Sequence, residues 1–361
     1  MSKKLRYGIV GCGAIANNKH LPSIKTINDG IEVVAFCDIV IERANKTNDK
    51  YAGGKGKVFA DYRELVKEDL DAVLVLTPNN SHCEISVAAL NAGKHVLCEK
   101  PMAMNYAEAQ KMIKASKDSG KMLTIAYQNR FRRDSLHLKN VCEAGELGDI
   151  YFAKAIAVRR RAVPTWGVFL DEEKQGGGPL IDIGTHALDL TLYAMDNYEP
   201  AYCVGSTFHK LNKDTNTANA WGDWDSKKFT VEDSAFGYVV MKNGAAIMLE
   251  SSWALNTLDV REAVTELCGT KGGADMPFEG KLRLNGVKHN AMYTTEPHLG
   301  GGGVAYFDGG EAKPADLEQK CFADAIRGIG KLKVLPEQAA AVTRILEGIY
   351  ISAKTGKQYV F

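Results

Sequence analysis

The sequence predicts an α/β fold, in which a doubly wound parallel sheet is followed by an α+β domain with a large, mostly antiparallel open sheet. Strands and helices alternate over the first 127 residues, which is typical of a parallel sheet. A glycine-rich turn follows the first apolar strand. Beyond residue 127, apolar segments follow one another with short connections, which favours antiparallel pairing.

Size and composition limit the class of protein. A chain of 361 residues exceeds the usual ~100–200 residues of one domain, and we place two domains at 1–127 and 128–361, with C-terminal helices that can pack back on the first. The net charge of +1 creates no field for nucleic acid or an anionic membrane, and no apolar run reaches the ~18 residues of a membrane span. The eight cysteines lack metal-ligand spacing and the N-terminus lacks a signal-peptide core. We therefore expect reduced thiols, no metal and a cytoplasmic location.

The first strand ends in Gly-x-Gly-x-x-Ala, a pattern that predicts a dinucleotide-binding Rossmann domain. We expect Gly11 to form the tight turn and Gly13 to let the backbone approach a pyrophosphate. Ala16 allows close packing of the following helix on the sheet. Ala14 and Ile15 begin that helix, whose N–H groups and dipole attract the phosphates.

Further polar residues follow the other strands of this domain. The expected strands are 5–10, 31–36, 58–59, 71–76, 94–98 and 122–126, with helices at 62–68, 81–92 and 106–119. Asp38, after the second strand, can accept hydrogen bonds from an adenosine ribose, which favours NAD over NADP. Thr77 and Glu99 follow later strands, so they reach the same carboxyl edge of the sheet, where ligands bind. Ser81 stands at the expected N-cap of the helix after Thr77.

Glu99-Lys100-Pro101 forms a second motif at this edge. A residue before proline avoids the helical region, so Lys100 is expected in an extended or turn geometry, and its peptide bond to Pro101 can be trans or cis. A lysine there can place a positive charge beside a nicotinamide and a substrate oxygen. The alternative is a solvated turn lysine.

The second domain begins after a crossover at 127–131. Its expected strands are 150–158, 202–208, 235–241, 245–253, 263–268 and 281–284, with helices at 135–143, 313–327 and 336–354. Asn243-Gly244 predicts a hairpin turn. One layer of helices leaves the second face of such a sheet open for a partner subunit, so we expect a homodimer or homotetramer. The tryptophan-bearing segment 212–228 is either a substrate or subunit contact or an exposed insertion, and 300–303 is expected to be a flexible loop.

A helix that begins at Pro179, after three glycines, carries the third motif. Helical spacing places Asp182, His186 and Asp189 on one face. A carboxylate beside an imidazole fixes the ring's tautomer and suits a general base near neutral pH. The same pattern also fits an ordinary helix with a satisfied histidine and a solvated acid.

Together, the glycine motif, Glu99-Lys100-Pro101 and Asp182-Ile-Gly-Thr-His186 with Asp189 resemble the glucose–fructose oxidoreductase / inositol dehydrogenase / MocA family, and the likeness covers essentially the whole chain. The resemblance implies NAD(P)-dependent oxidation or reduction at a sugar, glycoside or cyclitol carbon. It also implies a catalytic trio of Lys100, Asp182 and His186. By the same analogy, the nicotinamide and substrate contacts are Thr77, Asn79, His82, Glu99, Lys100 and Asn129, with Arg161 and Trp166 in the stretch that varies among members.

The expected reaction is hydride transfer between the nicotinamide and a secondary alcohol carbon, which in a glycoside can be C3. His186 would take the hydroxyl proton and Lys100 would stabilise the charge on the oxygen, although either of them can be the base. Asp182 would orient His186 or bind a neighbouring hydroxyl. One alternative is a glycoside-cleaving enzyme that oxidises C3 transiently before elimination. The other is a non-catalytic regulator that senses sugar or NAD, which the presence of both Lys100 and His186 argues against.

Overall fold

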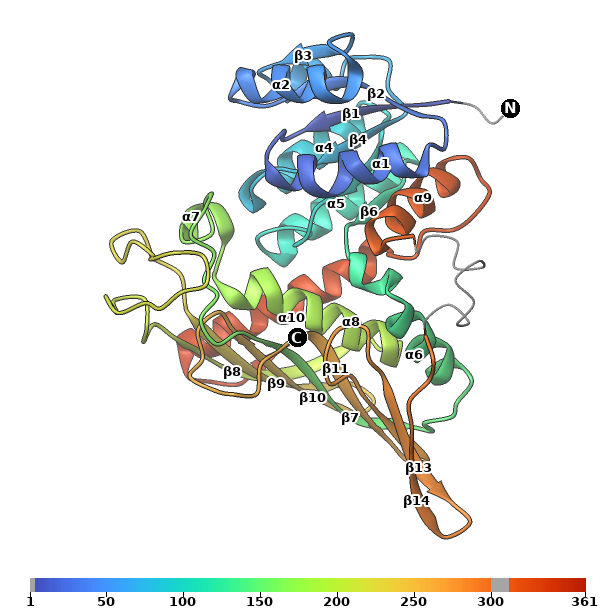
Figure 1. Ribbon diagram of the computed structural model, residues 1–361, viewed down its shortest axis with the longest axis vertical. Helices are drawn as coiled ribbons and strands as arrows, with labels where there is room; N and C mark the ends of the chain where they lie inside the picture. The colour runs from blue at the N-terminus through green and yellow to red at the C-terminus, as the bar shows by residue number, and fades with distance from the viewer. Residues whose placement is uncertain (1–3, 300–311) are drawn as a thin grey trace. The chain divides into compact units, whose positions relative to one another are not determined.

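The structure is a computed structural model that describes residues 4–299 and 312–361. The chain divides into two units (Figure 1). The first unit comprises Met1–Gln128 and Ala312–Ala340, and the second comprises Asn129–Glu311 and Ala341–Phe361. The glycine-rich loop expected at 300–303 lies outside the described residues.

The first unit contains a six-stranded sheet with the order β3-β2-β1-β4-β5-β6, and all five strand pairs are parallel. The strands are β1 (Leu5–Val10), β2 (Ile31–Cys37), β3 (Lys57–Phe59), β4 (Ala72–Val75), β5 (His95–Cys98) and β6 (Leu123–Ile125). This order is that of the Rossmann fold, and it reverses between β1 and β4, where such sheets bind ligands. The parallel, doubly wound sheet predicted from the sequence is confirmed.

Helices join these strands. They are η1 (Ala16–His20), α1 (Leu21–Ile27), α2 (Ile41–Ala52), α3 (Tyr62–Leu65), η2 (Asn79–Ser81), α4 (His82–Asn91) and α5 (Tyr106–Ser119). The expected helices do not include α2, because it buries only Ala44, Thr47 and Asn48 and therefore lacks an apolar stripe. At α5, the Asn105 side chain accepts from the backbone N–H of Glu108, which fixes where the helix begins.

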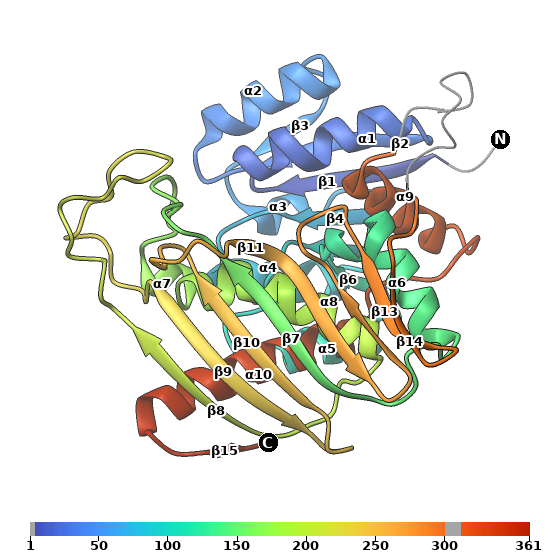
Figure 2. The same ribbon diagram turned by 60° about the horizontal axis from the view of Figure 1, so that its bottom comes forward.

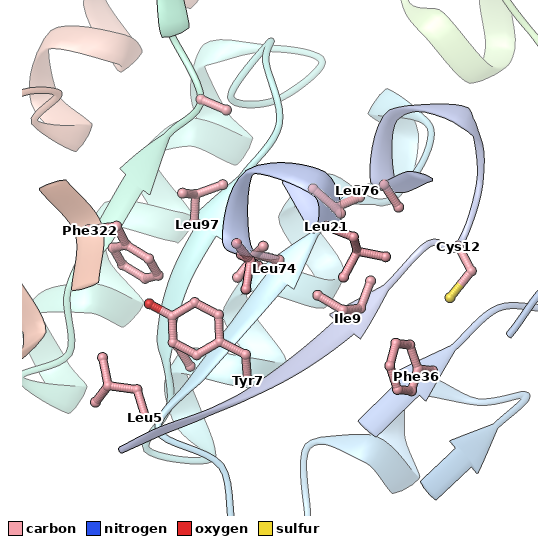
Figure 3. Packing of buried hydrophobic residues seen from close by; sticks show 14 of the residues in the cluster. Leu5, Tyr7, Ile9, Cys12, Leu21, Phe36, Leu74, Leu76, Leu97 and Phe322 are labelled. Carbon is pink, nitrogen blue, oxygen red and sulfur yellow. The ribbon is translucent and has the colours of Figure 1, made fainter. Parts of the chain in front are cut away.

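A late segment of the chain completes the core of this unit. Helix α9 (Pro314–Ile326) packs against α1, and its Phe322 joins the cluster formed by Leu5, Tyr7 and Ile9 of β1 (Figure 3). The rings of Tyr7 and Phe322 have centroids 6.0 Å apart. The side chains that hold β1 in place therefore come from both ends of the sequence, and β1 ends at the glycine motif.

The second unit contains a nine-stranded sheet with the order β14-β13-β12-β11-β7-β10-β9-β8-β15. The strands are β7 (Ile150–Val158), β8 (Pro200–Phe208), β9 (Ser234–Met241), β10 (Ala246–Ser252), β11 (Arg261–Gly269), β12 (Gly272–Asp275), β13 (Arg283–Lys288), β14 (Ala291–Thr295) and β15 (Tyr359–Val360). Only β7 and β10 pair in parallel among these described strands. The mostly antiparallel sheet is thus confirmed, as is the β9–β10 hairpin, where Gly244 has a φ of 89°. The short strands β12, β14 and β15 carry too few apolar residues to stand out in the sequence.

Helices cover one face of this sheet (Figure 2). Helix α8 (Thr185–Met195) packs on β7 and β11, and α10 (Pro336–Thr355) lies on β8 and β9. Gly205 and Gly237 allow α10 to approach closely, because a Cβ on either residue would collide with Ile349. The remaining helices are η3 (Gln128–Phe131), α6 (Arg133–Glu143), α7 (Glu172–Gln175) and η4 (Leu180–Gly184).

The opposite face of the sheet exposes apolar side chains. They are Val204 and Phe208 on β8, Tyr238 on β9 and Met248 on β10. None of the helices in the described ranges, 4–299 and 312–361, has the length and apolarity needed to cross a membrane.

Candidate active site

The glycine motif has the geometry that a dinucleotide needs. Gly11 has a φ of 95°, and a Cβ there would collide with the carbonyl oxygen of Leu76, so only glycine fits. A Cβ on Gly13, in contrast, would meet no atom within 4 Å. Ala16 is fully buried, whereas Ala14 and Ile15 are exposed at the start of the helix. Open space above Gly13, next to helical N–H groups, is where a pyrophosphate would lie.

Asp38 supports this loop from the end of β2. Its Oδ2 accepts from the backbone N–H of Cys12 and its Oδ1 accepts from that of Val40, both at 2.9 Å. Each carboxylate oxygen keeps a further acceptor position, so Asp38 can also accept from a ribose hydroxyl. Asp38, which we expect to bind the ribose, therefore also fixes the turn that would hold the pyrophosphate.

Thr77, Asn79 and His82 follow β4, next to the glycine motif. Ser81 is the N-cap residue of α4, as predicted, but its side chain makes no capping bond and its hydroxyl instead donates to Thr77 Oγ1 at 2.8 Å. Asn79 is buried. The His82 ring is fully buried, with Nδ1 2.8 Å from the Pro101 carbonyl oxygen and Nε2 2.9 Å from that of Thr77. His82 thus connects the loop after β4 to the loop after β5.

Glu99 lies in a buried cluster of charges. Lys19 Nζ and His20 Nε2 both approach Glu99 Oε1, at 2.9 and 2.7 Å, while Glu99 Oε2 accepts from the backbone N–H of Lys100 at 3.0 Å. Burial alone would raise the pKa of Glu99, but Lys19 and His20 hold it well below its usual range. The carboxylate therefore stays ionised and fixes the backbone of Lys100, which is half-buried and joined to Pro101 by a cis bond.

Helix α9 contributes the outer part of this cluster. Gln319 Nε2 donates to His20 Nδ1 at 2.8 Å, which leaves His20 Nε2 as the donor to Glu99. Glu318 lies 3.1 Å from Lys19 Nζ, and burial raises the pKa of Glu318 to about 7 despite that lysine. A segment about 200 residues further along the chain thus supports the Glu99-Lys100 motif.

In the second unit, the helix predicted at Pro179 consists of the π turn η4 followed by α8. In the fully described stretch from 177 to 194, every residue is buried except Asp182 and His186, which are both half-buried. A π turn holds more residues than an α-helical turn. Two residues four apart, such as Asp182 and His186, therefore point more nearly in the same direction from the helix axis. The helix therefore reaches the surface at two of the three expected catalytic residues.

The prediction that Asp189 shares a helix face with Asp182 and His186 is wrong. Asp189 is fully buried, and its carboxylate receives the Arg130 guanidinium through bonds of 2.6 to 3.2 Å. The wide turn of η4 rotates residue 189 away from Asp182, so a spacing of seven does not return to the same face. Asp189 forms a structural ion pair and does not line the surface with Asp182 and His186.

Two buried residues support this helix. Trp253 is fully buried, and its Nε1 donates to Asp182 Oδ2 at 3.0 Å. Glu232 accepts from the backbone N–H groups of Gly178 and Leu180, at 2.7 and 3.1 Å, and from the Tyr350 hydroxyl at 2.8 Å. Burial raises the pKa of Glu232 to about 7, although these three donors oppose the shift. Glu232 thus satisfies N–H groups where the helix begins.

The remaining expected contacts are also in the second unit. Asn129 is buried in η3. Arg161 donates to Asn256 Oδ1 at 3.2 Å and lies 3.8 Å from Asp214. Trp166 is 48% exposed, and its ring contacts that of Trp221.

Sequence reasoning missed the residues that hold these side chains in place. They are Lys19, His20, Glu318 and Gln319 around Glu99, and Glu232 and Trp253 around Asp182. Each is far in sequence from its partner, so no local spacing connects them. Among the missed residues, only Glu232 stands in an unusual sequence pattern: it is followed by a second acid, Asp233, directly before an apolar strand.

Comparison with known proteins matches both parts of the chain. Residues 5–127 match the GFO_IDH_MocA oxidoreductase family with its NAD-binding Rossmann fold, and residues 135–275 match the GFO/IDH/MocA C-terminal domain. The chain is 38% identical to a D-glucoside 3-dehydrogenase of Escherichia coli K12, over 98% of this chain and 97% of the relative. It is 41% identical to an inositol 2-dehydrogenase of Salmonella paratyphi B, over 40% of this chain and 43% of that one.

Solved structures share the fold at low sequence identity. A levoglucosan dehydrogenase in complex with NADH and levoglucosan has a TM-score of 0.82 at 19% identity, over 98% of each chain. An aldose-aldose oxidoreductase from Caulobacter crescentus has a TM-score of 0.79 at 22% identity, over 99% of this chain and 100% of that one.

Substitution of the two motif glycines should have different effects, one on protein stability and the other on NAD binding. Gly11→Ala should lower the stability of the protein without cofactor by about 1–3 kcal/mol, because the residue needs a positive φ and collides with Leu76. Gly13→Ala should leave stability within about 0.5 kcal/mol of the parent yet weaken NAD binding about tenfold or more, because its methyl group enters the open space. Thermal melts of both variants measure the change in stability, and NAD titrations measure the change in affinity. A Gly13→Ala protein that binds NAD like the parent contradicts the assignment.

Proposed function

Because this chain belongs to the GFO/IDH/MocA family of oxidoreductases and has its NAD-binding Rossmann domain, we propose that it oxidises a secondary hydroxyl of a D-glucoside, at C3. The observation that carries the proposal is the stretch 177–194, which contains η4 and most of α8 and is buried except at Asp182 and His186. The name of the E. coli relative, which matches nearly the full chain, supports the substrate and the carbon. Free sugars and inositols are the other members of the proposed substrate class.

Backbone groups and polar side chains would bind the cofactor. The N–H groups at Gly13, Ala14 and Ile15 would face the pyrophosphate, and Asp38 would accept from the ribose. The carboxylate repels a 2′-phosphate, so we propose NAD over NADP. We also propose that Thr77, Asn79 and Asn129 lie near the nicotinamide, whereas His82 and Glu99 act through the loops that they hold.

Three side chains would act on the substrate hydroxyl. The bound NAD would supply the acceptor for the hydride of the alcohol carbon. His186 removes the hydroxyl proton as general base, since an imidazole titrates near the working pH. Lys100 donates to the same oxygen and stabilises its developing negative charge. Asp182, whose Oδ2 accepts from Trp253, holds its other oxygen toward His186 or a neighbouring hydroxyl.

A substrate panel tests this function. The protein is incubated with NAD or NADP and with methyl D-glucosides, free glucose and myo-inositol, while reduced cofactor and the oxidised sugar are measured separately. We expect NADH and a 3-oxo-glucoside in equal amounts, and little reaction with NADP. Cleaved glycoside without net NADH would identify a transient-redox enzyme instead. No turnover of any sugar or cyclitol would contradict the proposal.

Replacement of the catalytic candidates tests their roles. His186→Ala should lower turnover by about 10²–10⁴-fold as loss of a general base, and Lys100→Ala by about 10²–10³-fold as loss of a charge at the reacting oxygen. Both variants should bind NAD nearly as the parent does. The double variant should lose less than the product of the two effects, because the residues act together.

The exposed His209, on the same unit, provides a matched control, and His209→Ala should keep full activity. Steady-state kinetics, NAD titration and melting temperatures are compared for all variants. A folded His186→Ala protein within about tenfold of parental turnover would end this mechanism.

We also propose that the apolar outer face of the second unit's sheet is covered by a second copy of the chain. Tyr238 and Met248 lie centrally on that face, on adjacent strands. Light scattering should give a mass at least twice 39.3 kDa, and Tyr238→Arg combined with Met248→Arg should reduce it. Ile329→Arg, at an exposed apolar position of the first unit, is the control. A parent protein of 39.3 kDa would contradict this.

A further inference from the structure

Two tryptophan side chains from distant segments lie together with much of their surface in solvent. Trp166, in the loop after β7, is 48% exposed, and Trp221 is 44% exposed. Their ring centroids are 5.0 Å apart and their planes meet at 77°. We call this pair the aromatic platform. Exposed apolar surface of this size costs solvation free energy that a bound ligand can recover.

Hydrogen bonds between the two segments fix the platform. Asn219 receives the backbone N–H of Val163 at 2.8 Å and donates to its carbonyl at 2.9 Å. The backbone N–H of Ala220 donates to the Arg161 carbonyl at 2.9 Å, and the Thr165 hydroxyl donates to that of Trp221 at 2.7 Å. The two rings are therefore held in place before any ligand binds, which reduces the entropic cost of binding.

Aromatic contacts connect the platform to a catalytic candidate. Phe169 lies between Trp166 and the buried Trp253, with ring centroids 5.9 and 6.5 Å away. Trp253 in turn donates to Asp182 at 3.0 Å. The platform is thus separated from Asp182 by two intervening aromatic side chains.

A second connection runs through Arg159. Its guanidinium lies 5.2 Å from the centre of the Trp221 ring. Burial would lower the pKa of Arg159, but its hydrogen bonds to Glu262 and the charges of Glu262 and Asp182 raise it. Both connections indicate that a ligand on the platform would lie beside a ligand held at Asp182.

We propose that the aromatic platform binds the second ring of a glycoside, namely the unit attached to the anomeric carbon of the reacting sugar. This inference rests on the proposed function. A sugar ring has apolar C–H faces, which pack on tryptophan, and a polar rim, which suits side chains such as Arg161 and Asn256 beside the platform.

Charge favours a neutral ring over a nucleotide. The Arg159 guanidinium is bound at two points by Glu262, both at 2.6 Å, and Arg161 lies near Asp214. Guanidinium groups that already have carboxylate partners have little charge left for a diphosphate. The occupant is therefore an uncharged sugar or a similar ring.

The test compares substrates that share the reacting ring. Methyl D-glucosides are compared with α- and β-linked glucosyl-glucose disaccharides. Trp166→Ala and Trp221→Ala should each lower kcat/KM for the disaccharides about tenfold or more, mainly through KM. Methyl glucosides lack the second ring, so the same variants should lose at least about threefold less of kcat/KM for them than for the disaccharides. Phe278→Ala, which removes another exposed aromatic side chain of this unit, should change neither.

A binding measurement separates this inference from the proposed function. Calorimetry with the same disaccharides, without NAD, measures the platform independently of turnover. In one outcome, the parent protein oxidises no glucoside but binds a disaccharide more tightly than both tryptophan variants do. That result would contradict the proposed function and support the aromatic platform as a binding site. Equal losses for both substrate types, no loss, or no disaccharide binding by the parent overturn the inference. A smaller mass of the variants in light scattering also overturns it, because the platform would then be a subunit contact.

Discussion

Backbone N–H groups held by buried carboxylates fix the loops that carry the candidate site. Asp38 accepts from Cys12 inside the glycine motif, and Glu99 accepts from Lys100. Glu232 does the same for Gly178 and Leu180, where the helix of Asp182 and His186 begins. A loop between a strand and a helix leaves N–H groups that no regular element satisfies, and an ionised carboxylate is the strongest acceptor a side chain offers. The positions of the candidate catalytic side chains therefore depend on these acids.

Burial of such acids has a cost, and the protein offsets it in different ways. Around Glu99, the cation Lys19 compensates the charge and the His20 ring donates a hydrogen bond, so the acid remains ionised. Around Glu232, the donors among the described residues are two N–H groups and a hydroxyl, and burial raises its pKa to about 7. The first loop is thus held by an ion pair at any ordinary pH. The helix of the second unit instead begins at a group whose charge changes near neutrality.

Much of the fold could be read from the sequence, because its signals are local. The order of strands, the turn at Gly11 and the start of a helix at Pro179 each follow from a few adjacent residues. The face of that helix could be predicted only in part. A π turn aligned Asp182 with His186 and turned Asp189 into the core, and no residue pattern announces such a turn. The residues that position Glu99 and Asp182 were missed because they come from distant segments.

The two units also differ in how strictly ligand binding determines which residue types they can carry. A dinucleotide has a fixed pyrophosphate, and backbone groups can hold it, so the requirement falls on glycines such as Gly11 and can be recognised. A sugar is recognised by side chains: Trp253 contacts Asp182, and the loop after β7 and segment 212–228 contact each other through Trp166 and Trp221. The two half-buried positions of the helix, Asp182 and His186, would serve any secondary alcohol. Discrimination among sugars must then lie in the side chains around the helix, which can change without disturbing the acids that hold the loops.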